Sequence, residues 1–506
     1  MITSLNPATG EERVLDVEET TLDQVAAICE LAHRATSELA TRSLTWRGSM
    51  LRAMADALEE SGESIIAAAD FETALGRARL KGELRRTAFQ LRFFADVVED
   101  TTFLAASIDH ATDSPMGPLA DMRRLRVPLG AVAVFGSSNF PFAFSVPGGD
   151  TASALAAGCA VVVKAHPAHP HTSALCAAAL REGARRVGAP EGTLEVVYGF
   201  AAGTALVTDA NIAAVGFTGS LFAGQALWRL ANERPVPIPF YGELGSANPL
   251  VVTPSAARVR AREIGAGAAG SMTLGVGQFC TKPGLLFVPE GSDGDALVNA
   301  LVESLVATST FTMLTGGIAA HFRESVAAIA AHEDVVALVA PAPEAGTTVR
   351  AQLFGVDART FASEAARDLR EECFGPLALV VRYESSDDLF AALRAASASL
   401  TLSVFAEAED PDAAGLVDFA ATRAGRVIVN GYPTGVGVSW SMHHGGPWPA
   451  TTAPLATSVG AAGIERWLRA LTYQSVPEAL LPAPLRDENP WGVARRVDGV
   501  LVARPV

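Results

Sequence analysis

Cysteine is scarce in this sequence, with five residues among 506 and no C-x-x-C pair. So few thiols in so long a chain exclude a disulfide framework, and their spacing gives no zinc or dithiol motif. The sequence also lacks an apolar run of about 20 residues, the length that crosses a bilayer, and its first residues lack the basic and apolar regions of a secretory signal. We therefore expect free thiols and a cytoplasmic protein.

An excess of positive charge is absent as well. Lysine and arginine number 39 against 55 aspartate and glutamate residues, for a formal net charge of -16 at pH 7. Binding to nucleic acid or to an anionic membrane needs clustered lysine and arginine, so we expect neither as a partner. Apolar residues are abundant, at 49% of the chain. With this length they predict a globular protein of two domains that acts on small molecules.

Apolar patterning divides the chain into helical and alternating regions. The first hundred residues have helical periodicity, and short apolar strands then alternate with alanine-rich helices. Such alternation predicts parallel sheets with crossover helices, an α/β fold. The expected strands are residues 131–135, 160–164, 194–197 and 213–215 in one region and 285–288, 377–381 and 426–430 in a second. The proline-rich tail from Pro477 predicts an extended arm.

One cysteine, Cys280, has the setting of a reactive thiol. It lies between Phe279 and Thr281, and the small residues 265–270 precede it, so we expect it on an accessible loop. Cys29 and Cys176 lie in apolar helical patterns and are expected to be buried. The alternative for Cys280 is an ordinary loop thiol.

Six short motifs follow one another along the chain. In order they are Gly136-Ser137-Ser138-Asn139-Phe140-Pro141, Val163-Lys164-Ala165-His166-Pro167, Gly216-Phe217-Thr218-Gly219-Ser220, Glu243-Leu244-Gly245, Gly277-Gln278-Phe279-Cys280-Thr281 and Glu372-Cys373-Phe374-Gly375-Pro376. This ordered set resembles the aldehyde dehydrogenase superfamily. The stretches Glu72-Thr73-Ala74-Leu75-Gly76 and Gly148-Gly149-Asp150-Thr151-Ala152 resemble its α-ketoglutarate semialdehyde (2,5-dioxopentanoate) dehydrogenase branch.

The resemblance implies a particular domain organisation. A modified Rossmann dinucleotide-binding domain would cover residues 1–242, with oligomerisation strands near 115–128. An α/β catalytic domain would cover residues 243–425. The C-terminal segment, residues 426–506, would return to the cofactor domain and the oligomer interface. A homodimer or homotetramer is implied.

The resemblance also assigns chemical roles to three residues. Cys280 would be the nucleophile that forms a thiohemiacetal and then, after hydride transfer, a thioester. The side-chain amide of Asn139 and the backbone N–H of Cys280 would stabilise the oxyanion. Glu243 would be the general base that activates the water for hydrolysis of the thioester.

Seven residues are implied in binding a dinucleotide. The segment of Gly216, Gly219 and Ser220 follows a strand and precedes a helix, where N–H groups could hold the pyrophosphate. Lys164 would bind the adenosine ribose, Glu372 the nicotinamide ribose, and Phe374 would pack near the nicotinamide. Pro167 stands where many NAD-preferring relatives have glutamate, which removes a charge that would repel a 2′-phosphate. We therefore expect NADP, with His166 as a phosphate partner and NAD also accepted.

Each assignment has a structural alternative. Asn139 fits a turn before Phe140-Pro141, Glu243 a solvated carboxylate, and Glu372 one half of an acidic pair with Glu371. Gly216 and Gly219 fit loop positions, and His166 fits a loop that closes a strand. No metal is assigned, because His443 and His444 would point to opposite faces of a strand and no third ligand is evident.

The substrate implied is 2,5-dioxopentanoate, oxidised to 2-oxoglutarate. Its carboxylate predicts an arginine or several polar donors in the substrate tunnel, although the sequence does not say which. The segment of residues 434–442 departs from that branch and places Trp440 where it could alter a pocket, so a medium- or long-chain aliphatic aldehyde is the alternative. A catalytically retired binding or structural homologue is a further alternative.

Overall fold

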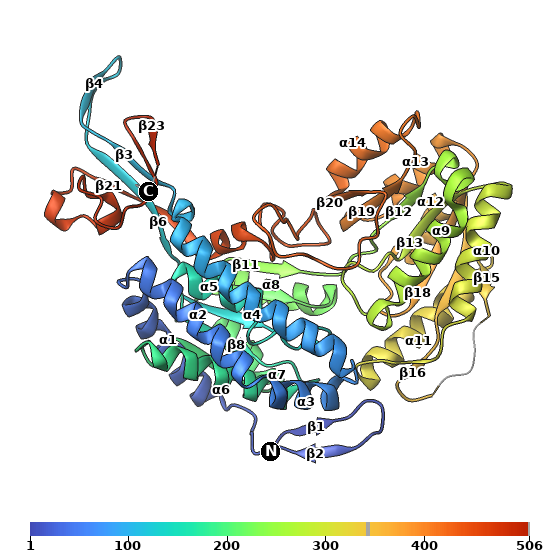
Figure 1. Cartoon of the computed structure of the whole chain (residues 1–506), viewed down its shortest axis with the longest axis horizontal. Helices are drawn as coiled ribbons and strands as arrows, with labels where there is room; N and C mark the ends of the chain where they lie inside the picture. The colour runs from blue at the N-terminus through green and yellow to red at the C-terminus, as the bar shows by residue number, and fades with distance from the viewer. Residues whose placement is uncertain (341–344, 504–506) are drawn as a thin grey trace.

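A five-stranded parallel sheet forms the centre of the first half of the chain, in a computed structural model that describes residues 1–340 and 345–503 (Figure 1). Its strand order is β11-β10-β7-β8-β9, and every neighbouring pair is parallel. The strands are β7 Ala131–Phe135, β8 Val161–Lys164, β9 Leu194–Val197, β10 Ile212–Thr218 and β11 Phe240–Glu243. Strands β7 and β8 are buried at every position, as expected where helices cover both faces of a sheet.

Helices surround this sheet. The helices that precede it are α1 Leu22–Leu39, α2 Leu44–Glu60, α3 Gly62–Thr73 and α4 Arg77–Asp100, after a hairpin of β1 Thr3–Leu5 and β2 Glu12–Val14. Those between its strands are α5 Gly149–Ala157, α6 Pro170–Arg186, α7 Phe200–Thr208 and α8 Leu221–Glu233. Alternating β and α elements with parallel pairing confirm the α/β fold class.

A seven-stranded sheet lies beside the first in Figure 1, with the order β15-β17-β18-β13-β12-β19-β20. Only β15 runs antiparallel to its neighbour. The strands are β12 Leu250–Val252, β13 Leu285–Pro289, β15 Val336–Val339, β17 Gln352–Asp357, β18 Leu377–Tyr383, β19 Ser399–Phe405 and β20 Ala424–Val429. Its helices are α9 Pro254–Thr273, α10 Ser292–Val306, α11 Gly316–Ala330, α12 Ala358–Ala362, α13 Ser386–Ala395 and α14 Ala413–Arg423. The boundary expected after residue 425, between the catalytic domain and the C-terminal segment, falls inside β20.

A third sheet forms an arm that projects from the body (Figure 1). Its order is β21-β6-β3-β22-β23, which brings the chain's last segments beside residues 106–128. The strands are β3 Ala106–Asp109, β6 Met122–Pro128, β21 Leu468–Gln474, β22 Arg495–Val497 and β23 Val500–Val502, and a hairpin of β4 Thr112–Ser114 and β5 Gly117–Leu119 extends from them. The tail expected as an extended arm is therefore partly paired in a sheet.

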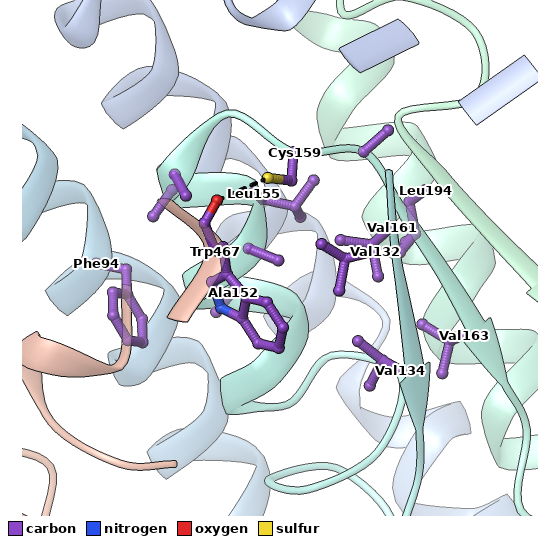
Figure 2. Packing of buried hydrophobic residues seen from close by; sticks show 14 of the residues in the cluster. Phe94, Val132, Val134, Ala152, Leu155, Cys159, Val161, Val163, Leu194 and Trp467 are labelled. Atoms are coloured by element: carbon purple, nitrogen blue, oxygen red, sulfur yellow. Dashed lines mark hydrogen bonds between the residues drawn. The ribbon is translucent and has the colours of Figure 1, made fainter. Parts of the chain in front are cut away.

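The C-terminal segment also enters the core of the first α/β region. Trp467 has 0% exposure and lies among residues of α4, α5 and the sheet, as Figure 2 shows. Its indole N–H donates to Ser153 Oγ at 2.8 Å, and its carbonyl accepts a contact from Cys159 Sγ at 3.6 Å. The chain thus crosses to the second sheet and returns to the first.

The small residues 265–270 are helical and do not belong to the loop expected for Cys280. They form the last part of α9. A Cβ on Gly265 would lie 2.4 Å from the carbonyl oxygen of Leu297 in α10, so the absent side chain allows two helices to pack closely. Within the described residues, no helix is both long and apolar enough to cross a membrane.

Candidate active site

Cys280 lies on a turn whose backbone is held from several sides. The turn follows the short helix Leu274–Gly277 and precedes β13, and the cysteine is half-buried. Asn248 donates from Nδ2 to the carbonyl oxygens of Cys280, at 2.7 Å, and Lys282, at 3.0 Å. Gln278 Oε1 accepts the N–H of Leu314 at 3.0 Å. The thiol is therefore presented by a fixed turn, while Cys29 and Cys176 are buried in helices as expected.

Glu243 ends β11 at the point where the chain leaves the first sheet. Its side chain is buried, with 4% of the residue exposed. Ser458 Oγ donates to Oε2 at 2.6 Å, and Oε1 lies 3.0 Å from His444 Nε2. The expected alternative of a solvated carboxylate is wrong, because the C-terminal segment covers Glu243.

His444 joins Glu243 to Cys280. Its Nε2 lies 3.6 Å from Cys280 Sγ and 3.0 Å from the Glu243 carboxylate. The ring is buried, and Thr457 Oγ1 accepts the His444 backbone N–H at 2.7 Å. One ligand atom from each of the three residues lies within 4.8 Å of the other two. From the sequence, no third ligand-type residue is evident near His443 and His444. In the structure, Glu243 and Cys280 lie beside His444, so that expectation is wrong for His444.

The three groups set one another's protonation. Burial raises the pKa of the Cys280 thiol well above its ordinary value, and the neighbouring Glu243 carboxylate raises it further. Burial also raises the pKa of Glu243, but His444 and the hydrogen bonds to Glu243 outweigh burial and hold that pKa below its ordinary value. The resting site therefore has a protonated thiol beside an ionised carboxylate, and an imidazole touches both.

Asn139 brings the loop after β7 against the cysteine turn. Its Nδ2 donates to the carbonyl oxygen of Gln278 at 2.8 Å, two residues before the thiol. Arg79 Nη2 donates to the carbonyl oxygen of Asn139 at 2.6 Å. The structure thus brings together Asn139, Glu243 and Cys280, three residues far apart in the sequence.

The residues expected to bind a dinucleotide lie mainly at the carboxyl ends of the first sheet's strands. Lys164 ends β8, and its ammonium lies 4.9 Å from the centroid of the Phe200 ring. Burial lowers the pKa of Lys164 to about 8, against the opposing effect of Glu19. Gly219 and Ser220 are exposed at the start of α8, where Ser220 Oγ accepts the N–H of Ala223 at 3.3 Å. This edge has the cation and the free helix N-terminus that a pyrophosphate fits.

Gly216 and His166 have partners within the protein. A Cβ on Gly216 would lie 2.7 Å from Asp150 Oδ2 and 3.0 Å from Trp467, so packing explains that glycine inside β10. His166 Nδ1 accepts the N–H of Ala168 at 3.1 Å. Burial, His169 and Lys164 all lower the pKa of His166 well below its ordinary value. His166 is therefore neutral and can offer a phosphate a hydrogen bond but no charge.

Glu372 and Phe374 lie in the segment before β18, and both are half-buried. Burial raises the pKa of Glu372 to about 7, although Lys282 and a backbone N–H of Ser246 act in the opposite direction. Glu372 in turn raises the pKa of Cys280, which places its charge near the thiol. The glutamate is thus poised to change its charge near neutral pH.

The site places a thiol, a carboxylate and an imidazole beside a parallel α/β sheet, and the chain belongs to the aldehyde dehydrogenase family, which matches residues 1–447. It is 44% identical over 481 residues to alpha-ketoglutaric semialdehyde dehydrogenase 2 of Azospirillum brasilense, with 94% of this chain and 91% of the relative covered. It is 38% identical over 487 residues to the alpha-ketoglutaric semialdehyde dehydrogenase of Acinetobacter baylyi, covering 96% and 92%. Members of this family oxidise aldehydes with NAD or NADP, and this chain is such an enzyme.

Solved structures share the fold. An NADP-dependent enzyme of E. coli aligns with a TM-score of 0.79 at 23% identity, over 94% of each chain. Aldehyde dehydrogenase C of Pseudomonas syringae, solved with NAD+ and octanal, aligns with a TM-score of 0.78 at 20% identity, over 93% of each chain. The predicted family and fold are both confirmed.

Proposed function

We propose that the enzyme oxidises 2,5-dioxopentanoate to 2-oxoglutarate with NADP, through a thioester on Cys280 that water hydrolyses. The observation that carries the proposal is the contact of one imidazole with both the thiol and the Glu243 carboxylate. The two relatives described above, which bear the name of this semialdehyde, support the substrate. One aldehyde, one oxidised cofactor and one water are consumed, and one acid, one reduced cofactor and one proton are released.

Acylation begins with the removal of the thiol proton. Because the pKa of the buried thiol is raised, Cys280 needs a nearby base, and His444 in its neutral form, with Nε2 unprotonated 3.6 Å from sulfur, accepts the proton as sulfur attacks the aldehyde carbon. Glu243 stabilises the protonated imidazole at 3.0 Å. The amide of Asn139 and the backbone N–H of Cys280 donate to the oxyanion. Glu372 and Phe374 would hold a nicotinamide that could take up the hydride, and the thioester would remain on Cys280 sulfur.

Deacylation uses the carboxylate. Glu243 stays ionised because its pKa is held low, so it can accept a proton from the water that attacks the thioester. A retained base favours water over phosphate or coenzyme A as the acceptor. Product analysis with and without coenzyme A tests this step, since formation of an acyl-coenzyme A would contradict hydrolysis.

The residue at position 167 supports NADP over NAD. Position 167 carries a proline and so supplies no carboxylate to repel a 2′-phosphate, although Glu19 acts on Lys164 from elsewhere in the fold. Lys164, Gly216, Gly219, Ser220, Glu372 and Phe374 are proposed as cofactor residues, with His166 as a neutral donor to the phosphate. Because His166 adds no charge, the preference for NADP over NAD should be modest, and the enzyme should also accept NAD as its cofactor.

The domain roles follow from these assignments. We infer that residues 1–242 bind the dinucleotide, that residues 243–425 carry the cysteine, and that residues 426–506 return to the cofactor domain. The arm, with β6 and β21 paired over seven residues, is proposed as the oligomer interface of a cytoplasmic homodimer or homotetramer. Light scattering of the purified enzyme measures the subunit number directly.

A panel of aldehydes tests the substrate. We expect kcat/KM for 2,5-dioxopentanoate to exceed the values for succinic semialdehyde, glutaraldehyde and decanal, each measured with NAD and NADP. An aromatic cluster, in which the Phe140 ring centroid lies 5.3 Å from Phe144 and 5.0 Å from Phe279, supports the alternative of an aliphatic aldehyde. Trp440 does not support that alternative, because its exposed ring packs on Phe93 at 5.6 Å. A preference for decanal would overturn the proposed substrate. A lack of activity toward every aldehyde of the panel would indicate a catalytically retired homologue.

A further inference from the structure

One face of α4 lies against the loop that carries Asn139. Arg79, Glu83 and Arg86 are spaced by four and three residues, which places them on the same side of the helix. Glu83 Oε1 accepts the backbone N–H groups of Phe142 and Ala143 at 2.9 and 3.0 Å. These two hydrogen bonds fix the register of the helix against the loop, and Arg86 lies one turn further along.

Arg86 contacts both the loop that follows β7 and the segment of Val436. Its guanidinium is 5.3 Å from the centroid of Phe144, and the Phe144 ring is 6.4 Å from the ring of His444, which contacts Cys280. On its other side, Nη2 donates to the carbonyl oxygen of Val436 at 3.2 Å. Arg86 is thus one aromatic ring away from the residues proposed to react.

The charge of Arg86 is unpaired within the described residues 1–340 and 345–503. It forms no ion pair there, and its Nη1 is buried without a hydrogen-bond partner. Burial raises the pKa of Glu83, the carboxyl on the same helix face, although Arg79, two backbone N–H groups and Arg86 act in the opposite direction. A buried guanidinium nitrogen with no hydrogen-bond partner is costly unless an anion binds it, because its N–H groups have lost their hydration.

A second arginine lies at the turn that leads to Val436. Arg426 on β20 donates from Nη2 to the carbonyl oxygen of Pro433 at 2.6 Å and from Nη1 to that of Gly435 at 3.1 Å. Its Nε is also buried without a partner among the described residues. Burial lowers the pKa of both Arg86 and Arg426, and a charge on Cys280 opposes this effect in both, so both arginines lie within electrostatic reach of the thiol.

We propose that Arg86 binds the carboxylate of the substrate through Nη1 while the aldehyde carbon at the other end of the molecule meets Cys280. The ligand class is a short, unbranched oxo acid with an aldehyde and a carboxylate at opposite ends. Arg426 holds the turn of residues 433–435 that presents the Val436 carbonyl to Arg86. This inference rests on the proposed function, and it names the residue that selects an acid over a neutral aldehyde.

The competing explanation is that Arg86 only holds the turn through Val436. The two explanations differ in substrate dependence. Loss of a structural contact would lower activity toward every aldehyde, whereas loss of a carboxylate-binding group would lower activity only toward aldehydes that carry a carboxylate.

The test compares 5-oxopentanoate with pentanal, two five-carbon aldehydes of which only the first carries a carboxylate. We expect the ratio of their kcat/KM values to fall about 100-fold in Arg86→Met, mainly through KM for 5-oxopentanoate, since a hydrogen bond to a charged group is lost. Arg86→Lys should restore part of the ratio, because it keeps the charge but not the planar donors. Arg85→Met is the matched control, since Arg85 is exposed on the same helix, and it should keep the wild-type ratio.

The outcomes separate this inference from the proposed substrate. An unchanged ratio in Arg86→Met, or a wild-type ratio with no preference for the acid, would overturn the role of Arg86. If the ratio falls as expected but wild-type enzyme shows no preference for 2,5-dioxopentanoate over 5-oxopentanoate, the carboxylate site stands and the proposed substrate fails.

Discussion

At the scale of single residues, the site combines groups that oppose one another's ionisation. A buried thiol resists ionisation, and a carboxylate beside it adds to that resistance, yet the same carboxylate must stay ionised to activate water. His444 reconciles the two requirements, because its Nε2 lies 3.6 Å from sulfur and 3.0 Å from the carboxylate. The two half-reactions therefore share one imidazole.

Replacing the two reacting side chains should separate the half-reactions. Cys280→Ala should abolish oxidation and leave cofactor binding intact, whereas Glu243→Gln should keep a burst of NADPH and slow turnover by about 100-fold or more. Rapid-mixing absorbance and titration of cofactor fluorescence measure both properties. Full steady-state activity in Cys280→Ala would refute the assigned nucleophile.

The pH profile should report His444. The pKa of Glu243 is depressed in the folded enzyme, in part by His444, so the carboxylate stays ionised until the pH falls through this low value. In His444→Gln that pKa should rise, and the acid limb of the kcat profile should move to higher pH. The burst should also slow, because the thiol loses its nearest base. An acid limb that stays in place would show that His444 does not control Glu243.

Cofactor affinity should depend on pH through Glu372. Its pKa is raised to about 7, so the side chain is neutral below that pH and a carboxylate acceptor above it. If Glu372 holds the nicotinamide ribose, NADP binding should strengthen as the pH rises through 7, and Glu372→Gln should bind more weakly with no such dependence. Calorimetric titrations at pH 6 and pH 8 provide the comparison. Equal affinities in wild-type enzyme at the two pH values would contradict this role.

At the scale of elements, α9, which leads toward the turn that carries Cys280, packs closely on α10. Gly265→Val would drive a side chain into the carbonyl of Leu297, 2.4 Å from the position of a Cβ. We expect a loss of stability of about 1–3 kcal/mol or more, measured by urea unfolding. Gly270→Ala in the same helix is the control, because a Cβ there meets no atom within 4 Å, and it should stabilise by about 0.5–1 kcal/mol. Equal effects of the two changes would contradict the close packing.

The same elements show what the sequence could and could not predict. Strand 131–135 was expected at the residues of β7 because five consecutive apolar residues suit a sheet buried on both faces. The helix over residues 265–270 was not expected, because glycine and alanine suit both a flexible segment and a closely packed helix. His444 could not be found from spacing, since it meets Cys280 across 164 residues of chain. Arg86 could not be found from the sequence either, because its lack of an ion-pair partner depends on how α4 packs against the loop that carries Asn139.

At the scale of the whole molecule, the C-terminal segment ties the two α/β regions together. It supplies β20 to the second sheet, His444 and Ser458 to the active site, Trp467 to the first core and β21 to the arm. Trp467→Ala should lower the free energy of unfolding by about 3–5 kcal/mol, and with it the urea midpoint, because a large buried ring and its hydrogen bond to Ser153 are lost. Urea unfolding followed by circular dichroism measures it. An unchanged midpoint would mean that this segment does not stabilise the first region.

The covalent intermediate gives the most direct test of the whole account. Glu243→Gln enzyme would be mixed with NADP and 2,5-dioxopentanoate, quenched in acid and digested for peptide mass spectrometry. We predict an acyl group of the substrate's mass on the peptide that contains Cys280, in an amount equal to the NADPH formed in the burst. NADPH formation with an unmodified Cys280, or an acyl group on another residue, would contradict it.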